Sequence, residues 1–257
     1  MTEVPPEQFQ AFVASVFNET DSIAKRYFNN HGDVDAKQDA SPVNVADRVI
    51  EQLIREHIER AYPEHSIMGE EQADKQTASP HCWVIDPIDG TKAFIAGVPT
   101  FTTMIGLMHD DVPIYGAISQ PIERRRWLSC EKYQPAAPIG DLAEAGLAEL
   151  VCATTSDGYF SDKQLKALEH MEQQGAVIHH GGDAYAYMML AEGKFDIVFD
   201  VGFQPYDVIP MLPILQEAGM WVGFFEDAKP SMRITNNVVV ARSPDAGRAV
   251  LGLLLGR

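Results

Sequence analysis

Two aspartates stand where an apolar run of the sequence ends. In "WVIDPIDGTKAF", Asp86 and Asp89 are three positions apart, and Gly90 and Thr91 follow directly. Burying an unpaired carboxylate costs a large amount of free energy, because its charge loses its hydration. Two carboxylates at the end of a buried strand therefore predict a cation that faces them.

Two common aspartate motifs do not fit this stretch. An EF-hand loop beginning at Asp86 would need Gly at its sixth position and Glu at its twelfth, where the sequence has Thr91 and Gly97. A haloacid-dehalogenase phosphatase would carry its nucleophilic aspartate two residues before the Asp-Gly-Thr, and that position is Pro87. A further interpretation, in which Asp89 only caps a helix at "GTKAF", leaves the first aspartate and the acidic "GEE" upstream unexplained.

The elements that would position these aspartates are two helices and several strands. Apolar residues at helical spacing predict one helix after Pro5-Pro6. A second helix is predicted over residues 45–58, before Pro63, and its apolar face would consist of Val45, Val49, Leu53, Ile54 and Ile58. "WVID" is predicted as a strand, and "TFTTMIGLMHDDVPIYGAISQP" as an antiparallel hairpin that turns at Asp110-Asp111. "RWLSC" is a further candidate strand.

The second half of the chain alternates strands and helices. Between Gln134 and Glu149 the sequence becomes rich in Pro, Ala and Gly, which predicts a boundary between subdomains 1–135 and 136–257. Beyond it we expect strands at "LVCATT", "AVIHH", "FDIVFD" and "NNVVVAR". Helices are expected at "SDKQLKALEHMEQQ", "DAYAYMMLAEG", "YDVIPMLPILQEAG" and "SPDAGRAVLGLLLG". The order predicts an α+β half followed by an α/β half.

The composition is that of an acidic globular chain. Its 257 residues include 20 Lys and Arg against 37 Asp and Glu, a formal charge of −17. Nucleic acid polymers need a basic surface, so none is expected as a partner. Three widely spaced cysteines fit neither a disulfide framework nor a zinc site, which favours the cytoplasm. The sequence shows no signal peptide and no apolar run of membrane-spanning length, so no membrane partner is expected.

Three motifs resemble those of the inositol monophosphatase family of metal-dependent phosphatases. They are "GEE" with Glu70, "WVIDPIDGT" and "PYD" with Asp207, and the resemblance covers most of the chain. It implies a layered α-β-α-β-α sandwich of that family's type, with an antiparallel sheet in the first half and a smaller mixed sheet in the second. The segments "KQDASPVNVADR", "TKAFIAGVPTF", "SQPIERRRW", "GGDAYAY" and "FQPYD" resemble the family's histidinol-phosphatase branch.

Some positions depart from the family pattern. Asn44 stands where Thr is usual, "EAGMWV" replaces the usual Ala-Gly-Gly, and His179 and His180 precede the double glycine near which arginine is common. These departures concern the substrate more than the metal. Because adjacent residues of a strand point to opposite faces, at most one of the two histidines could face a site, and we assign neither.

The resemblance implies two or three Mg²⁺ per active site. Glu70, Asp86 and the Ile88 carbonyl would hold the first, and Asp86, Asp89 and Asp207 the second. Hard oxygen ligands suit Mg²⁺, whereas two bare carboxylates about 4 Å apart repel by about 4 kcal/mol at an effective dielectric of about 20. Two divalent cations can stabilise the charge on a reacting phosphoryl group and activate water, which the slow hydrolysis of phosphate monoesters demands.

The resemblance also assigns residues beyond the metal ligands. Asp47 and Thr91 would orient the attacking water, although a surface ion pair with Arg48 or a plain helix cap are alternatives. Gly90 and Thr91 would bind phosphate, since Gly allows close backbone approach and a helix N-terminus offers free N–H groups. Asp183 and Asp200 would contact the substrate, Asp183 facing an amine or imidazole. Their alternatives are an N-cap and a loop aspartate.

We therefore predict a Mg²⁺-dependent phosphoric monoester hydrolase acting on a small phosphomonoester, with L-histidinol phosphate the favoured substrate. Inositol monophosphate, a nucleotide 3′-phosphate or fructose bisphosphate are alternatives within the family. A non-catalytic metal-binding homologue is the alternative of another class, which would not need the water-orienting pair. Inhibition by lithium and a homodimer are implied by the resemblance alone.

Overall fold

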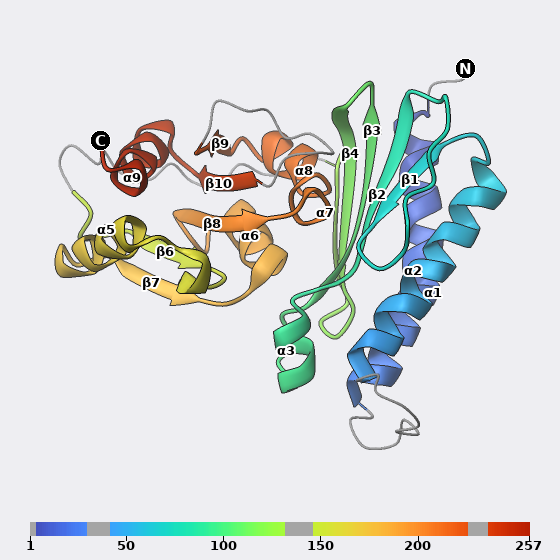
Figure 1. Ribbon diagram of the computed structural model, residues 1–257, viewed down its shortest axis with the longest axis horizontal. Helices are drawn as coiled ribbons and strands as arrows, with labels where there is room; N and C mark the ends of the chain where they lie inside the picture. Colours follow the sequence, from blue (N-terminus) through green and yellow to red (C-terminus); the bar gives the residue numbers. More distant parts are fainter. Residues whose placement is uncertain (1–3, 30–41, 132–145, 226–235) are drawn as a thin grey trace. The chain divides into compact units, whose positions relative to one another are not determined.

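The computed structural model describes residues 4–29, 42–131, 146–225 and 236–257 and contains two compact units (Figure 1). Unit 1 comprises Met1–Glu131 with Tyr206–Ile214, and unit 2 comprises Lys132–Pro205 with Leu215–Arg257. The predicted boundary between residues 135 and 136 lies outside the described residues. Asp207 belongs to unit 1, together with the acidic residues of the first half of the chain.

Two long helices cover one face of the sheet in unit 1 (Figure 1). The first is α1 (Pro6–Asn29) and the second is α2 (Pro42–Ala61), and both are confirmed as predicted elements. On α2 the buried apolar stripe runs through Ala46, Ile50, Ile54 and Ile58, whereas Val49 is 39% exposed. The stripe is therefore rotated from the predicted one, and α2 turns Asp47 and Glu51 inward as well.

The sheet of unit 1 has the order β1-β2-β3-β4-β5. Its strands are β1 (Ser66–Gly69), β2 (His81–Asp89), β3 (Thr102–His109), β4 (Val112–Gln120) and β5 (Arg125–Leu128). All neighbours are antiparallel except β1 and β2, which are parallel. β1 was not predicted, because four residues carry too little periodicity. The hairpin turn is confirmed, with Asp110 and Asp111 at φ 48° and 60°, a left-handed backbone that aspartate tolerates.

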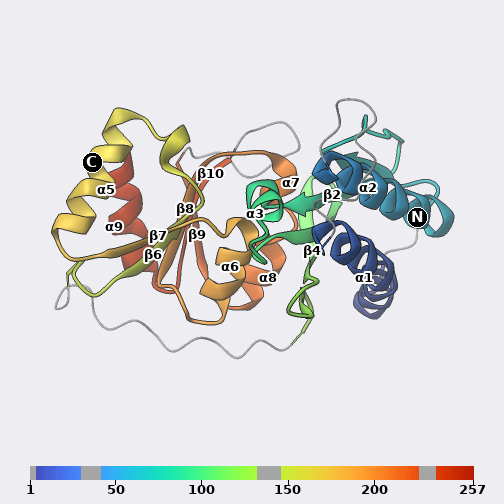
Figure 2. The same ribbon diagram turned by 90° about the horizontal axis from the view of Figure 1, so that it is seen from below.

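The sheet of unit 2 is mixed, in the order β7-β6-β8-β10-β9. Its strands are β6 (Val151–Thr154), β7 (Val177–His180), β8 (Ile197–Phe203), β9 (Trp221–Phe224) and β10 (Asn236–Ala241). The helices α5 (Asp162–Gln173) and α9 (Pro244–Leu255) pack together on one face, and α6 (Asp183–Ala191) lies on the other (Figure 2). Within the described residues this sheet has as many strands as the first, because Trp221–Phe224 forms an edge strand.

The helix predicted over "YDVIPMLPILQEAG" is wrong as a single element. The chain forms two short helices, α7 (Pro205–Val208) and α8 (Leu212–Glu217), with Pro210 between them. Proline cannot donate the backbone hydrogen bond of a helix interior. The break brings Pro210 against the sheet of unit 1, where Gly106 and Gly116 pair across β3 and β4.

In the part of the chain that the structure describes, no helix combines the length and hydropathy needed to cross a membrane.

Candidate active site

Asp86 and Asp89 share a bulged end of β2. Asp86 pairs with Met104 and Asp89 with Thr102, so three steps along β2 match two along β3. In a regular strand, residues three apart would face opposite sides of the sheet. The extra residue at the bulge restores a common side, and Pro87, which has no N–H, suits that irregular place.

Asp207 completes a cluster of carboxylates in unit 1. Oxygens of Asp86, Asp89 and Asp207 all lie within 4.8 Å of one another. Asp86 and Asp89 are buried, and Asp207 is half-buried on α7. The Thr102 hydroxyl donates to Asp89 at 3.3 Å, whereas the buried Oδ1 of Asp86 finds no hydrogen-bond partner among the described residues.

The electrostatics of this cluster fit a hard divalent cation. Burial, together with the carboxylates of Glu70, Asp89 and Asp207, holds the pKa of Asp86 well above its usual range. A cation would reverse that shift by replacing repulsion with attraction. The three clustered donors are all carboxylate oxygens. Such hard oxygen ligands suit Mg²⁺ better than they suit softer metals. The residues present therefore fit the metal that the sequence predicts.

Glu70 follows β1 and lies near the cluster. Burial of its carboxyl group and the charges of Asp207 and Glu71 raise its pKa to about 7, while a hydrogen bond with Asp86 lowers it. The residue as a whole is exposed. Because solvent reaches the side chain, the neighbouring carboxylates account for more of this shift in pKa than burial does. Its place beside Asp86 is compatible with the predicted first metal position.

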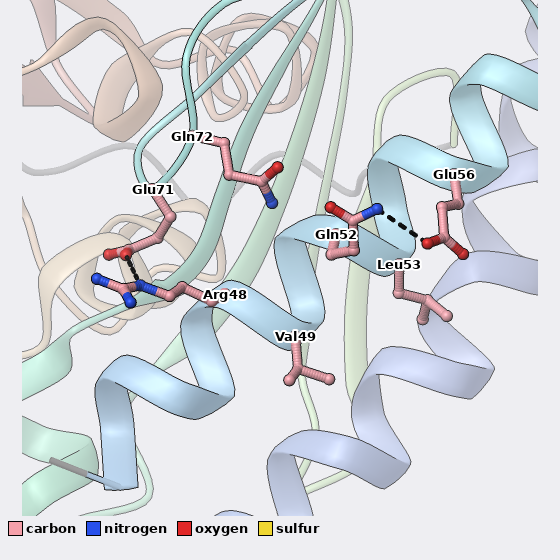
Figure 3. A pocket seen from close by; sticks show the side chains of 7 residues that line it. All are labelled: Arg48, Val49, Gln52, Leu53, Glu56, Glu71 and Gln72. Atoms are coloured by element: carbon pink, nitrogen blue, oxygen red, sulfur yellow. Dashed lines mark hydrogen bonds and ion pairs between the residues drawn. The ribbon is translucent and has the colours of Figure 1, made fainter. Parts of the chain in front are cut away.

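Asp47 is not a surface residue. It is 3% exposed on α2, and its Oδ1 finds no hydrogen-bond partner among the described residues. Burial and the charges of Glu71, Glu70 and Glu51 raise its pKa to about 8. Arg48 instead points outward and pairs with Glu71 at 3.7 Å (Figure 3). The alternative of an Asp47–Arg48 surface ion pair is therefore wrong, and the role of Asp47 in orienting water stays a prediction.

An open pocket lies on the outer side of α2. Figure 3 shows the residues that line it, which are Arg48, Val49, Gln52, Leu53, Glu56, Glu71 and Gln72. None of the predicted catalytic or metal-binding residues is among them. The pocket is therefore separate from the carboxylate cluster, although both adjoin the turn that carries Glu70.

Gly90 and Thr91 form the corner between β2 and α3 (Thr91–Ala96). Gly90 is the N-cap, in a left-handed backbone at φ 85°, and no side chain caps the helix. The interpretation of Asp89 as a mere helix cap is thus unsupported. The Thr91 hydroxyl donates to the Ile88 carbonyl at 3.3 Å, which places it at the same corner as the aspartates. The roles of Gly90, Thr91 and Ile88 stay predictions.

Asp183 opens α6 in unit 2. It follows two glycines at φ 101° and 106°, and it has a positive φ of 45° itself. Gly182 is the N-cap, and no side chain caps α6, so Asp183 does not act as the N-cap. Its contact with a substrate stays a prediction. His179 and His180 are both exposed on the edge strand β7.

The carboxylate of Asp200 accepts hydrogen bonds from three donors within unit 2. Its Oδ1 accepts hydrogen bonds from the Thr154 hydroxyl at 3.1 Å and the Thr155 amide at 2.6 Å, and its Oδ2 accepts from the Tyr187 hydroxyl at 2.8 Å. The residue is 2% exposed, and burial raises its pKa to about 7 although the three hydrogen bonds lower it. It is not a loop aspartate. Its predicted contact with substrate remains a prediction, and its visible contacts join β6, β8 and α6.

Comparisons with known proteins identify the family of the chain. The model of the inositol monophosphatase family matches residues 6–252. The chain is 33% identical to a bifunctional phosphatase, IMPL2, chloroplastic, of Arabidopsis thaliana, over 98% of this chain and 76% of that protein. It is 34% identical to a histidinol-phosphatase of Streptomyces coelicolor, over 72% of this chain and 74% of that protein.

Solved structures show the same fold. An inositol monophosphatase from Zymomonas mobilis is 27% identical with a TM-score of 0.84, over 98% of this chain and 99% of that one. One from Anabaena, at 21% identity and a TM-score of 0.76, covers 97% of this chain and 96% of that one, and it supports the fold alone. The predicted fold class is confirmed. The chain belongs to the inositol monophosphatase family and is a phosphoric monoester hydrolase.

Proposed function

We propose that the protein hydrolyses L-histidinol phosphate to L-histidinol and phosphate with the help of Mg²⁺. The hydrolytic part of the proposal is carried by the cluster of Asp86, Asp89 and Asp207, whose oxygens lie within 4.8 Å of one another. The substrate is supported by relatives named histidinol-phosphatase in Streptomyces coelicolor, Mycobacterium tuberculosis and Chlorobaculum parvum, at 34%, 31% and 29% identity.

The metal ligands in this proposal come from unit 1. Glu70, Asp86 and the Ile88 carbonyl would hold one Mg²⁺, and Asp86, Asp89 and Asp207 a second, with Asp86 shared. When bound, the cations supply Lewis-acid stabilisation of the negative charge on the phosphoryl oxygens. The raised pKa of Asp86 supports this assignment, since the carboxylates repel one another until a cation neutralises them.

Asp47 and Thr91 orient the attacking water in this proposal, and the carboxylate of Asp47 receives its proton. Asp47 is 3% exposed and its Oδ1 has no hydrogen-bond partner among the described residues, which supports a role for this carboxylate as the acceptor of the water proton. The Thr91 hydroxyl donates a hydrogen bond to the Ile88 carbonyl. Its lone pairs therefore remain able to accept a hydrogen bond from water. Gly90, with no side chain and a left-handed backbone, leaves room for a phosphate to approach the corner.

Asp183 supplies the preference for a cationic alcohol. Histidinol phosphate carries an ammonium group and an imidazole, and a carboxylate hydrogen-bonds such groups strongly. Asp200 contributes through α6, because its hydrogen bond from Tyr187 links that helix to β8. The indirect role is favoured over direct contact between Asp200 and the substrate, because three internal donors already bind its carboxylate.

A broader specificity is the second candidate. Relatives are named fructose-1,6-bisphosphatase/inositol-1-monophosphatase in Aquifex aeolicus and inositol-1-monophosphatase in Synechocystis, each 28% identical, and the Arabidopsis relative is named bifunctional. We would rank histidinol phosphate, inositol 1-phosphate, fructose 1,6-bisphosphate and a nucleotide 3′-phosphate by kcat/KM. Histidinol phosphate should lead. If another ester exceeds it tenfold, the substrate assignment fails and the hydrolase assignment remains.

Two other features belong to the same proposal. A non-catalytic metal-binding protein is the alternative of another class, and it would be favoured if the protein released no phosphate at any Mg²⁺ concentration. Two further relatives, at 28% and 27% identity, are named Nus factor SuhB. The protein is also proposed to be a lithium-inhibited homodimer of the cytoplasm. Cys82, Cys130 and Cys152 form no disulfide in the described part of the chain, which suits a reducing compartment. Light scattering would measure the mass of the oligomer.

A further inference from the structure

Glu51 is a buried glutamate that the sequence does not single out. It lies on α2 with no exposed surface, four residues after Asp47. Its Oε2 accepts a hydrogen bond from the Glu71 amide at 2.8 Å, and its Oε1 accepts one from the Gln72 amide at 3.2 Å. These two amides directly follow Glu70 in the chain, so Glu51 holds the turn that carries a predicted metal ligand.

Arg55 closes the same arrangement. Its Nε donates to Glu51 Oε1 at 2.7 Å, and one of its terminal nitrogens donates to the Gln72 carbonyl at 3.2 Å. Gln72 is therefore held at both its N–H and its C=O by one buried ion pair. Arg55 is only 7% exposed, and a buried ion pair of this kind is maintained when its remaining hydrogen-bonding groups are also satisfied.

Gly69, on the other side of Glu70, touches the same pair. A Cβ atom there would overlap Glu51 Oε1 and would lie 2.6 Å from Glu51 Cδ and 2.9 Å from the nearer terminal nitrogen of Arg55. The φ of Gly69 is not positive, so the requirement for glycine is one of space. Both neighbours of Glu70 in the chain are thus packed against Glu51.

We infer that Glu51 and Arg55 are positioning residues, which fix the turn 69–72 and thereby set the affinity of the site for its divalent cation. This inference rests on the proposed role of Glu70 as a metal ligand. Neither residue touches the reacting atoms in this account. Partners that orient metal ligands typically change metal affinity by roughly 10- to 100-fold when they are removed. A purely structural ion pair would change stability and leave that affinity unaltered.

The test measures Mn²⁺ binding to the full chain by electron paramagnetic resonance, without any substrate. Glu51→Gln keeps the size of the side chain but loses its charge and one of its two acceptor oxygens. We expect its Mn²⁺ dissociation constant to rise roughly 10- to 100-fold. The matched control is Glu56→Gln on the same helix, which removes an exposed glutamate whose hydrogen bond comes from Gln52 and should leave the constant unchanged.

Steady-state kinetics add a second readout. In Glu51→Gln the Mg²⁺ concentration for half-maximal activity should rise by the same factor, while kcat at saturating Mg²⁺ should stay within about threefold of wild type. If Glu51→Gln does not fold, Arg55→Lys carries the test, because lysine keeps the charge but cannot bond Glu51 and the Gln72 carbonyl together. The Mn²⁺ dissociation constant of Arg55→Lys should rise at least threefold.

The outcomes separate this inference from the proposed function. Wild-type affinity for Mn²⁺ in a folded Glu51→Gln variant, or in Arg55→Lys when only that variant folds, overturns the positioning role and leaves the phosphatase proposal intact. No Mn²⁺ binding by the wild-type protein overturns both. Weakened binding with a kcat restored by excess Mg²⁺ supports the positioning role.

Discussion

Gly116 lies so close to Pro210 that a methyl group on Gly116 would overlap the Pro210 carbonyl oxygen. Gly106, its partner across β3 and β4, approaches the same proline, with a Cβ that would lie 3.1 Å from Pro210 Cα. The segment 206–214 belongs to unit 1, and Pro210 is one of its contacts with the sheet of that unit. Asp207 belongs to that segment, so its approach to Asp86 and Asp89 depends on two glycines far from it in the sequence.

Gly116→Ala should therefore damage the site from a distance. Overpacking a well-filled region costs about 1–3 kcal/mol, and relief by a shift of Pro210 would displace Asp207. We expect a lower melting temperature and a weaker affinity for Mn²⁺. Gly252→Ala is the control, since that glycine lies in α9 with open space at its Cβ and alanine favours a helix. If Gly116→Ala binds Mn²⁺ as wild type does, Asp207 is not positioned through Pro210.

Removal of metal should abolish activity reversibly. The clustered ligands are carboxylates, so a chelator should reduce phosphate release to background and added Mg²⁺ should restore it. Excess Ca²⁺ should inhibit, because its larger and more variable coordination shell places the reacting groups less strictly. Phosphate release is measured after dialysis against the chelator. Full activity in metal-free buffer would contradict the mechanism.

Asp86→Asn should separate stability from activity. Asp86 is 1% exposed, and burial and four neighbouring carboxylates disfavour its charge. The substitution should raise the melting temperature of the chelator-treated protein. It should also lower kcat roughly 10³-fold or more, since several kcal/mol of cation-derived stabilisation are lost. Thr91→Ala is the comparison, with a reduced kcat and a nearly unchanged Mn²⁺ affinity. A destabilised Asp86→Asn protein would show that its charge is already balanced within the chain.

The metal-free protein should lose stability as the pH rises. The pKa of Asp47 is about 8 and that of Glu70 about 7, against about 4 in an unfolded chain. Between these values the folded state binds more protons than the unfolded state, so the free energy of unfolding falls with increasing pH. The melting temperature in chelator should drop from pH 5 to pH 8.5.

Two additions make the pH experiment specific. Saturating Mg²⁺ should flatten the profile, because a bound cation stabilises the charged carboxylates. Asp47→Asn should remove part of the slope in chelator. A melting temperature that rises through this window in the metal-free protein would show that these carboxylates are paired in the folded state.

Local sequence patterns predict some parts of the fold and of the site. A buried strand that ends in two aspartates is visible in the residue order, and so is the hairpin at Asp110-Asp111. The bulge at Pro87 that turns Asp86 and Asp89 to one side is a property of the pairing with β3. Helical periodicity located α2 but gave its inner face inaccurately, because Asp47, Glu51 and Arg55 are buried polar residues.

Contacts between distant segments explain what the sequence could not provide. Glu51 holds residues 20 and 21 positions further along the chain, and a single sequence does not reveal such a partnership. The spacing of Asp47, Glu51 and Arg55 at four-residue intervals was the available signal, since three charged residues on one helical face require partners if that face is buried. Pro210 is visible as a helix breaker, but its place against Gly106 and Gly116 is not.

Asp183→Asn tests the proposed substrate. A hydrogen bond to a charged group contributes about 1.5–3 kcal/mol, so kcat/KM for histidinol phosphate should fall roughly 10- to 150-fold. Hydrolysis of inositol 1-phosphate, which has no cationic group, should change far less. The backbone should tolerate the substitution, because Asp183 has a φ of 45° and asparagine adopts the left-handed region readily. α6 also has no side-chain cap to lose.

Asp162→Asn is the matched control for this substrate test. Asp162 is the first residue of another helix in unit 2, α5, and is exposed, so the substitution removes one charge from a comparable helix start. It should leave the ratio of the two kcat/KM values unchanged. If Asp183→Asn lowers kcat/KM for both esters equally, Asp183 has a structural role and specificity arises elsewhere. If the wild-type protein itself prefers inositol 1-phosphate, histidinol phosphate is not its substrate, and the carboxylate cluster still accounts for a phosphoric monoester hydrolase.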